Sequence, residues 1–323
     1  RYAEAEPLYQ RALQLRERSL GPEHPLVAHP LNNLALLYYD QGKYVEAESL
    51  YQRALGILEQ RPGPEHPDDI ASPLNGLARL YHDQGKYEQA KPLYQRALQL
   101  RERSLGPEHP RVTYSLTGLA FLYQEQGKYM EAEPLYQRAL GILEQRLGPE
   151  HPLGLYPLDG LADLYTEQGK YELAELLYQR ALRIREQHLG PEHPDMAYSL
   201  NGLANLYRNW GKYVEAEPLY QRSLRIREQV LGPKHPLTAK TLYDLAQFRD
   251  IQGNHEEART VYIHALMVRE QALGASHPYV TKTRQHLIAL LHAMGRHKEI
   301  AQFETPVYNH GHPPSGREPH HLL

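Results

Sequence analysis

Apolar and small residues recur along the chain in two alternating patterns, and both patterns have helical spacing. In "SLTGLAFLYQEQ", Leu116, Leu119, Ala120 and Tyr123 lie at positions i, i+3, i+4 and i+7. Residues at that spacing share one face of a helix. The second pattern, "KYMEAEPLYQRALGILEQR", keeps helical spacing over a longer run that begins at Lys128. Together the two patterns predict a pair of helices, which we call helix A and helix B.

The helix pair repeats along the chain with a period of 42 residues and one step of 43. A fixed period of this length is typical of a solenoid, in which neighbouring units bury each other's apolar faces. We expect an all-α array over residues 1–304, made of an isolated helix B (1–20), six full pairs and a degenerate last unit. In that unit Ile300 and Glu304 replace the usual small and aromatic residues, which is typical of a terminal cap.

The turns between helices carry repeated helix-ending and helix-starting residues. Gly127 follows helix A, where a left-handed residue closes the last turn and glycine has no Cβ penalty. The Gly-Pro of "LGPEHP" ends helix B, and Pro110 suits the first position of the next helix A. His109 then falls at the N-cap, where its imidazole can accept a backbone N–H. The equivalent positions are His24, His66, His151, His193, His235 and His277.

A shared metal site is not expected from these histidines. Equivalent positions on neighbouring helices lie at least ~8–10 Å apart, whereas two imidazoles that share an ion each approach it to ~2 Å. We therefore interpret the histidines as local caps.

Prolines inside the helical patterns constrain where the helices begin. Pro134 and its equivalents should lie in the first turn of helix B, where a missing N–H costs nothing, so helix B should begin at or after Tyr129. Pro30, Pro73 and Pro157 lie about five residues beyond the His-Pro proline. They predict that these three A helices start late or are kinked.

Small and aromatic residues at fixed positions predict the core. The alanines are small where helix A approaches its partner, and the tyrosines fill the space between helices rather than form a cofactor site. The two sets are Ala35, Ala78, Ala120, Ala162, Ala204 and Ala246, and Tyr51, Tyr94, Tyr136, Tyr178, Tyr220 and Tyr262.

Composition excludes several classes of function. The 323 residues carry a net charge of −3 and no cysteine, which argues against nucleic-acid binding, disulfides and thiolate chemistry. No apolar run approaches the ~20 residues that span a bilayer. No P-loop, HExxH, GxSxG or Rossmann motif occurs, so we expect no enzyme activity, cofactor or metal. The absence of cysteine suits a cytoplasmic protein.

The sequence at each end of the chain supports a separate prediction. The start "RYAEAEPLYQ" suggests a fragment of a longer protein. Residues 305–323 are rich in Pro, Gly and His without an apolar period and predict a disordered tail.

Leu-Ala-x-x-Tyr in helix A, the Gly after it, and Ala132, Tyr136 and Ala139 in helix B resemble a tetratricopeptide repeat (TPR). The period, "GKYxEAEPLYQRAL" and "LGPEHP" are more particularly similar to the repeats of kinesin light chains. The resemblance implies a right-handed superhelix of antiparallel helix pairs whose concave face, lined by helix A, holds an extended peptide or a partner helix. Carried over position by position, it implies the contact residues Asn32, Asn75, Arg79, Tyr114, Thr117, Phe121, Tyr156, Asp159, Asp163, Tyr198, Asn201, Asn205, Arg208 and Lys240.

Charge along this face suggests the kind of ligand. Tyr156 has Asp159, Asp163 and Glu167 beside it, whereas Lys240 and other basic residues lie toward the C-terminal end. Aromatic faces with neighbouring carboxylates favour Lys or Arg. We therefore expect a peptide with a basic residue over Tyr156 and acidic residues toward Lys240.

Two classes of function remain open at this point. The chain is either a protein-interaction scaffold or sensor region of a larger signalling protein, or a repeat segment of a multidomain enzyme joined to a protease or an ATPase. A purely structural repeat without a ligand is a further alternative. The partner and the oligomeric state do not follow from the sequence.

Overall fold

The computed structural model describes residues 2–60 and 67–304, and these residues form α-helices joined by short turns, with no β-strand among them. His66 and the tail 305–323 lie outside the described residues. The helices are α1 (Tyr2–Leu20), α2 (Ala28–Asp40), α3 (Tyr44–Glu59), α4 (Pro67–Asp83), α5 (Tyr87–Leu105), α6 (Val112–Glu125), α7 (Tyr129–Leu147), α8 (Leu155–Glu167), α9 (Tyr171–Leu189), α10 (Met196–Trp210), α11 (Tyr213–Leu231), α12 (Pro236–Ile251), α13 (His255–Leu273), α14 (Pro278–Ala293) and α15 (His297–Glu304).

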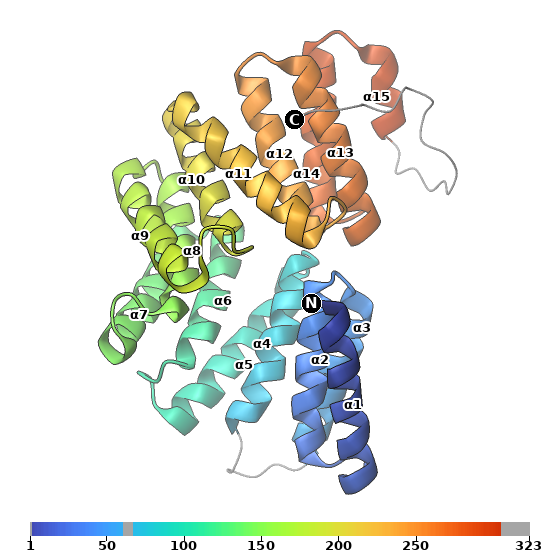
Figure 1. The fold of residues 1–323 in the computed structure, drawn as a ribbon, viewed down its shortest axis with the longest axis vertical. Helices are drawn as coiled ribbons and strands as arrows, with labels where there is room; N and C mark the ends of the chain where they lie inside the picture. The colour runs from blue at the N-terminus through green and yellow to red at the C-terminus, as the bar shows by residue number, and fades with distance from the viewer. Residues whose placement is uncertain (1, 61–66, 305–323) are drawn as a thin grey trace.

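The helices form antiparallel pairs that stack into a coiled solenoid (Figure 1). The even-numbered helices from α2 to α14 are the predicted A helices, and the odd-numbered helices are the B helices. Along the coil the chain turns back on itself, so that α12 and α14 begin next to the ends of α2 and α4. The all-helical solenoid predicted from the periodicity is confirmed.

Each described histidine of this series accepts a backbone N–H at the start of an A segment, but only His235 and His277 are the N-caps of their α-helices, α12 and α14. The prediction that His109 is the N-cap of helix A was wrong, because α6 begins one residue after Arg111 and His109 caps the turn before it. The Nδ1 atom of His109 accepts a hydrogen bond from the backbone N–H of Arg111 at 3.2 Å, and His151 does the same for Leu153 at 3.2 Å. Gly127, which has φ of 70°, ends the preceding helix in the left-handed region. These local caps satisfy N–H groups that have no intrahelical partner.

The prolines behave partly as predicted. Helix B does begin at its tyrosine, as α7 does at Tyr129. Pro134 is nevertheless the sixth residue of α7, beyond the first turn, so the expectation that this proline lies in the first turn was wrong. The helix tolerates the single missing backbone hydrogen bond, because α7 packs along its length against neighbouring helices.

The A helices with an extra proline start late in two cases. A 3₁₀ turn at Pro25–Val27 precedes α2, and another at Pro152–Gly154 precedes α8. Pro30 and Pro157 thereby become the third residue of each α-helix, where no N–H is needed. Pro73, in contrast, lies inside α4.

Tyrosines and alanines form the core at the predicted positions. Tyr136 and Ala120 are completely buried and pack in one cluster, and the equivalent residues of the other pairs are buried in the same way. The ring of Tyr136 also lies against Gly160 of α8, where a Cβ atom would come within 2.4 Å of the ring. Glycine at this position therefore lets consecutive repeats approach closely.

Candidate functional site

The concave face of the coil is lined by the A helices, and charges on helices that are not neighbours in the chain affect one another's pKa values there. Burial raises the pKa of Asp40 at the end of α2, Arg79 of α4 opposes this rise, and the negative charge of Asp195 before α10 adds to it. Arg79 also interacts with Tyr156 of α8. Side chains of α2, α4 and α8, together with Asp195 before α10, therefore influence one another electrostatically on the inside of the coil.

Aromatic residues of this inner face are open to solvent. Tyr114 of α6 is 47% exposed and Tyr156 of α8 is 59% exposed, whereas the core tyrosines are buried. Arg79 is also exposed, and its guanidinium lies 4.4 Å from the ring centroid of Tyr39. Asn32, Asn75, Thr117, Phe121, Asp163, Tyr198, Asn205, Arg208 and Lys240 are partly buried.

Asp159 and Asn201 are not brought to the surface. Asp159 is 0% exposed and accepts hydrogen bonds from Arg185 at 2.5 Å and from Ser199 at 2.6 Å. Asn201 is 2% exposed and donates to Asp244 at 2.6 Å. The structure places both inside the repeat interface because the next helix pair covers their position on helix A. Their roles are structural, and neither contacts the open face.

Other predicted contact residues already have partners within the chain. Asn75 accepts a hydrogen bond from Ser115 at 3.1 Å, and Asn205 accepts one from Tyr220 at 2.6 Å. Arg208 donates to Gln247 at 3.0 Å. The bonds of Asn75 and Arg208 link consecutive repeats, and that of Asn205 joins the two helices of one pair. All three fix the side chains, so a ligand at these positions would meet an ordered polar surface.

A carboxylate cluster occupies the middle of the inner face. Asp163 of α8 accepts hydrogen bonds from the hydroxyl groups of Tyr178 and Tyr198. Burial nevertheless raises the pKa of Asp163 to about 6, although Lys240 opposes the rise. Burial and the charge of Asp163 raise the pKa of Glu167 to about 7. The ammonium group of Lys240 lies 5.4 Å from the ring centroid of Tyr198.

A row of buried arginines was missed by the sequence reasoning. Arg101, Arg185, Arg227 and Arg269 lie at one position of helix B, and each donates to a Ser or Thr of the next helix A, as Arg227 does to Thr241 at 2.5 Å. Where helix B has Leu143 instead, the next helix A has Pro157. A Ser or Thr follows each of these four arginines by 14 residues, and this repeated spacing is the signal that could have revealed the row, although the exposed Arg16 is followed by Pro30 at the same separation.

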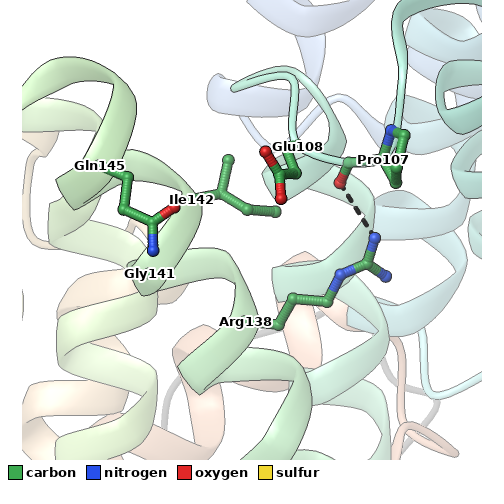
Figure 2. Close-up of a pocket in the computed structure, with 6 residues that line it drawn as sticks. All are labelled: Pro107, Glu108, Arg138, Gly141, Ile142 and Gln145. Carbon is green, nitrogen blue, oxygen red and sulfur yellow. Dashed lines mark hydrogen bonds between the residues drawn. The ribbon is translucent and has the colours of Figure 1, made fainter.

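A shallow depression lies away from the inner face, where the turn between α5 and α6 meets α7. Figure 2 shows its lining residues, with Arg138 donating a hydrogen bond to the carbonyl of Pro107 at 3.0 Å. The depression has a volume of about 350 Å³ and borders on Gly141, whose missing side chain leaves space beside Ile142. We assign no chemistry to it, because it holds no pair of groups suited to acid–base or nucleophilic catalysis.

Metal and membrane sites have no structural counterpart in the described ranges. Among residues 2–60 and 67–304 no three His, Asp or Glu side chains gather in a way that could hold a metal ion. None of the helices in the same ranges is long and apolar enough to cross a membrane.

Stacked helix pairs with an inner face lined by one helix of each pair define a helical-repeat solenoid. Tetratricopeptide repeat models match residues 1–60, 69–145, 112–187, 177–228, 195–249 and 238–279. The chain belongs to the tetratricopeptide repeat family.

Several solved structures are similar to this chain. BtubC (BKLC) from P. vanneervenii is 26% identical with a TM-score of 0.54, over 72% of this chain and 91% of that one. The apo form of RapI is 18% identical with a TM-score of 0.63, over 84% of this chain and 92% of that one, and shares the fold. Kinesin light chain-like TPR repeats from Podosopora anserina are also among the neighbours, at 28% identity, a TM-score of 0.48, and 64% and 98% coverage. No curated protein matches the chain.

Proposed function

We propose that this chain is a non-catalytic scaffold that binds a segment of a partner protein on its inner face. Tetratricopeptide repeats generally serve as protein–protein interaction scaffolds. The observation that carries the proposal is the exposure of Tyr114 and Tyr156 on the neighbouring A helices α6 and α8, whereas core tyrosines such as Tyr136 and Tyr178 are buried. Exposed tyrosines supply large, rigid contact area and are enriched in protein interfaces.

Charge supports a ligand with a basic centre. Glu125 and Glu167 are exposed at the ends of the same two helices. Partial burial of its carboxylate and then the negative charge of Asp163 raise the pKa of Glu167 to about 7, so a nearby positive charge would favour its ionised form. A Lys or Arg side chain of the ligand would supply that charge.

The position of the basic residue differs from the one that the sequence suggested. Arg79 already interacts with Tyr156, so a second cation over that ring would meet a like charge. We therefore place the ligand's basic residue toward Glu125 and Glu167, and its acidic residues toward Arg79 and Lys240.

A peptide-array screen followed by charge reversal tests the proposal. The double change Glu125→Lys and Glu167→Lys should weaken the selected peptides at least tenfold, because two attractive contacts become repulsive. The matched control is Glu131→Lys with Glu172→Lys, the same charge change at exposed positions in the first turns of α7 and α9. Equal loss in both variants, or selected peptides without a basic residue, would contradict the proposal. Asp159 is unsuitable for reversal, because its partner Arg185 is buried with it.

A further inference from the structure

Two histidine caps reach across the coil to a different turn of the superhelix. The Nε2 atom of His235, before α12, lies 3.0 Å from the carbonyl oxygen of Asp40 at the end of α2. One repeat further along, Nε2 of His277 makes the same contact with the carbonyl of Asp83 at the end of α4. The partners are 195 and 194 residues apart in the chain. The successive A helices α12 and α14 thus contact the successive A helices α2 and α4, and both pairs of helices make the same kind of contact.

Hydrogen-bonding chemistry at both contacts is complementary. His235 and His277 each accept a backbone N–H at Nδ1, from Leu237 and Tyr279. In the neutral ring the proton is then on Nε2, which donates to the carbonyl. Burial lowers the pKa of both histidines and favours this neutral form. The accepting carbonyls lie at the ends of α2 and α4, where helical carbonyls lack intrahelical partners.

Backbone packing at the second contact is equally specific. Gly85 lies so close to Pro278 that a Cβ atom on the glycine would come within 2.6 Å of the proline ring. Gly127 and Gly169, which have the same left-handed backbone in other repeats, have nothing within 4 Å. The close approach is therefore a property of this contact and not of the repeated turn.

The contact joins the two ends of the coil around the inner face. Arg79 and Tyr156, on the A helices α4 and α8, lie close enough on this face for each to affect the other's pKa. An α-helix with its side chains is ~10–12 Å wide, and most of its backbone N–H and C=O groups are already paired. An extended peptide is narrower and carries its own unpaired backbone N–H and C=O groups, which suit the polar lining of the A helices.

From this geometry we infer that the inner face is an enclosed channel for an extended peptide segment, and that the contacts of His235 and His277 with α2 and α4 form a clasp that must open to admit it. The inference rests on the proposed function for the identity of the occupant. The clasp itself is testable without any ligand.

Thiol labelling provides that test, because the chain has no cysteine of its own. The probes are a small maleimide and the same maleimide carried on a polyethylene glycol chain, applied to full-length Tyr156→Cys. The thiol faces the channel, and Met130→Cys, at a site on α7 that is 83% exposed, serves as the open reference. A closed clasp lets the small reagent react at both sites but slows the polymer reagent at position 156.

The clasp variant is His235→Asn with His277→Asn, because asparagine keeps the N-cap but is too short to reach the other turn. His151→Asn with His193→Asn is the matched control, since these histidines make the same caps at 3.2 and 3.3 Å. Within the described residues their Nε2 atoms have no such cross-turn bond. Loss of two hydrogen bonds should raise the polymer's labelling rate at position 156 about tenfold or more, with little change in the control.

The inference fails if the polymer reagent reacts as fast at position 156 as at position 130 in the unaltered background. It also fails if the clasp variant and the cap control accelerate equally. Either result would leave the peptide-array test of the inner face unaffected, so failure of the clasp and failure of the proposed function are distinguishable.

Discussion

Arg185 donates a hydrogen bond from Nη2 to Oδ2 of Asp159 at 2.5 Å, and the two side chains are 3% and 0% exposed. The pair joins helix B of one repeat to its own helix A, while Ser199 of the next repeat completes the network. A buried ion pair of this kind contributes little net stability when intact, but removal of one partner leaves an uncompensated charge.

Asp159→Ala should therefore lower the free energy of unfolding by ~3–5 kcal/mol, because Arg185 remains buried without its counter-charge. Urea denaturation measures the change. Asp195→Ala removes an exposed carboxylate nearby and should stay within ~0.5 kcal/mol. Similar effects of the two substitutions would argue against a buried pair.

Leu143 and Pro157 occupy the positions that hold Arg185 and Ser199 one repeat later. Leu143→Arg alone should destabilise by several kcal/mol, because the buried guanidinium would face the ring of Pro157, which offers no hydrogen-bond acceptor. Adding Pro157→Ser supplies a hydroxyl acceptor and should restore a measurable part of the loss. Thermal unfolding measures the stability of both variants. If the double variant is no more stable than Leu143→Arg alone, the pairing of a buried Arg with a Ser 14 residues later is contradicted.

Two glycines inside helices should respond to alanine in opposite directions. A Cβ atom at Gly160 would lie 2.4 Å from the Tyr136 ring, so Gly160→Ala should destabilise by ~1–3 kcal/mol through overpacking. Gly141 has nothing within 4 Å, and Gly141→Ala should stabilise by ~0.5–1 kcal/mol. The signs are read from denaturant midpoints, and equal signs would contradict the packing assigned to Gly160.

Replacement of a histidine cap by a better one should cost little. Because the role of His109 is to accept the N–H of Arg111, His109→Asn should leave the unfolding free energy within ~1 kcal/mol of wild type. Calorimetry measures the stability, and zinc titration of the same samples serves as the control for metal binding. Tight stoichiometric zinc binding that disappears in the variant would overturn the cap interpretation.

Asp163 and Glu167 predict a dependence of stability on pH. Their folded-state pKa values of about 6 and about 7 lie above the ordinary values of 3.8 and 4.5, so the folded state binds more protons than the unfolded state between these limits. Their contribution to stability therefore falls as the pH rises from about 4 to about 7.

Variants isolate this contribution from that of other titrating groups. Asp163→Asn with Glu167→Gln should flatten the decrease, so the stability difference between variant and wild type should widen in the variant's favour as the pH rises. Chemical denaturation at a series of pH values tests it. A difference that is independent of pH would show that neither carboxyl has a raised pKa.

Features that depend on a few neighbouring residues were determined by the sequence alone. The hydrogen bond that His109 accepts from Arg111 and the start of helix B at Tyr129 follow from hydrogen-bonding groups and fixed backbone angles within one turn. The burial of Tyr136 follows from its place on one helical face. Pro134 was misplaced because its helix is held by packing along its length, which overrides a local preference.

Only the tertiary structure decided which inner-face residues are open. Helical periodicity shows that Asp159 and Tyr156 point toward the same side, but it does not show that the next repeat covers the aspartate and leaves the tyrosine exposed. The contact of His235 with Asp40 was even less predictable from the sequence, because it depends on small rotations between consecutive repeats that accumulate over 195 residues. A local sequence pattern fixes each repeat, whereas the summed geometry of the repeats sets the curvature of the coil and brings its ends together.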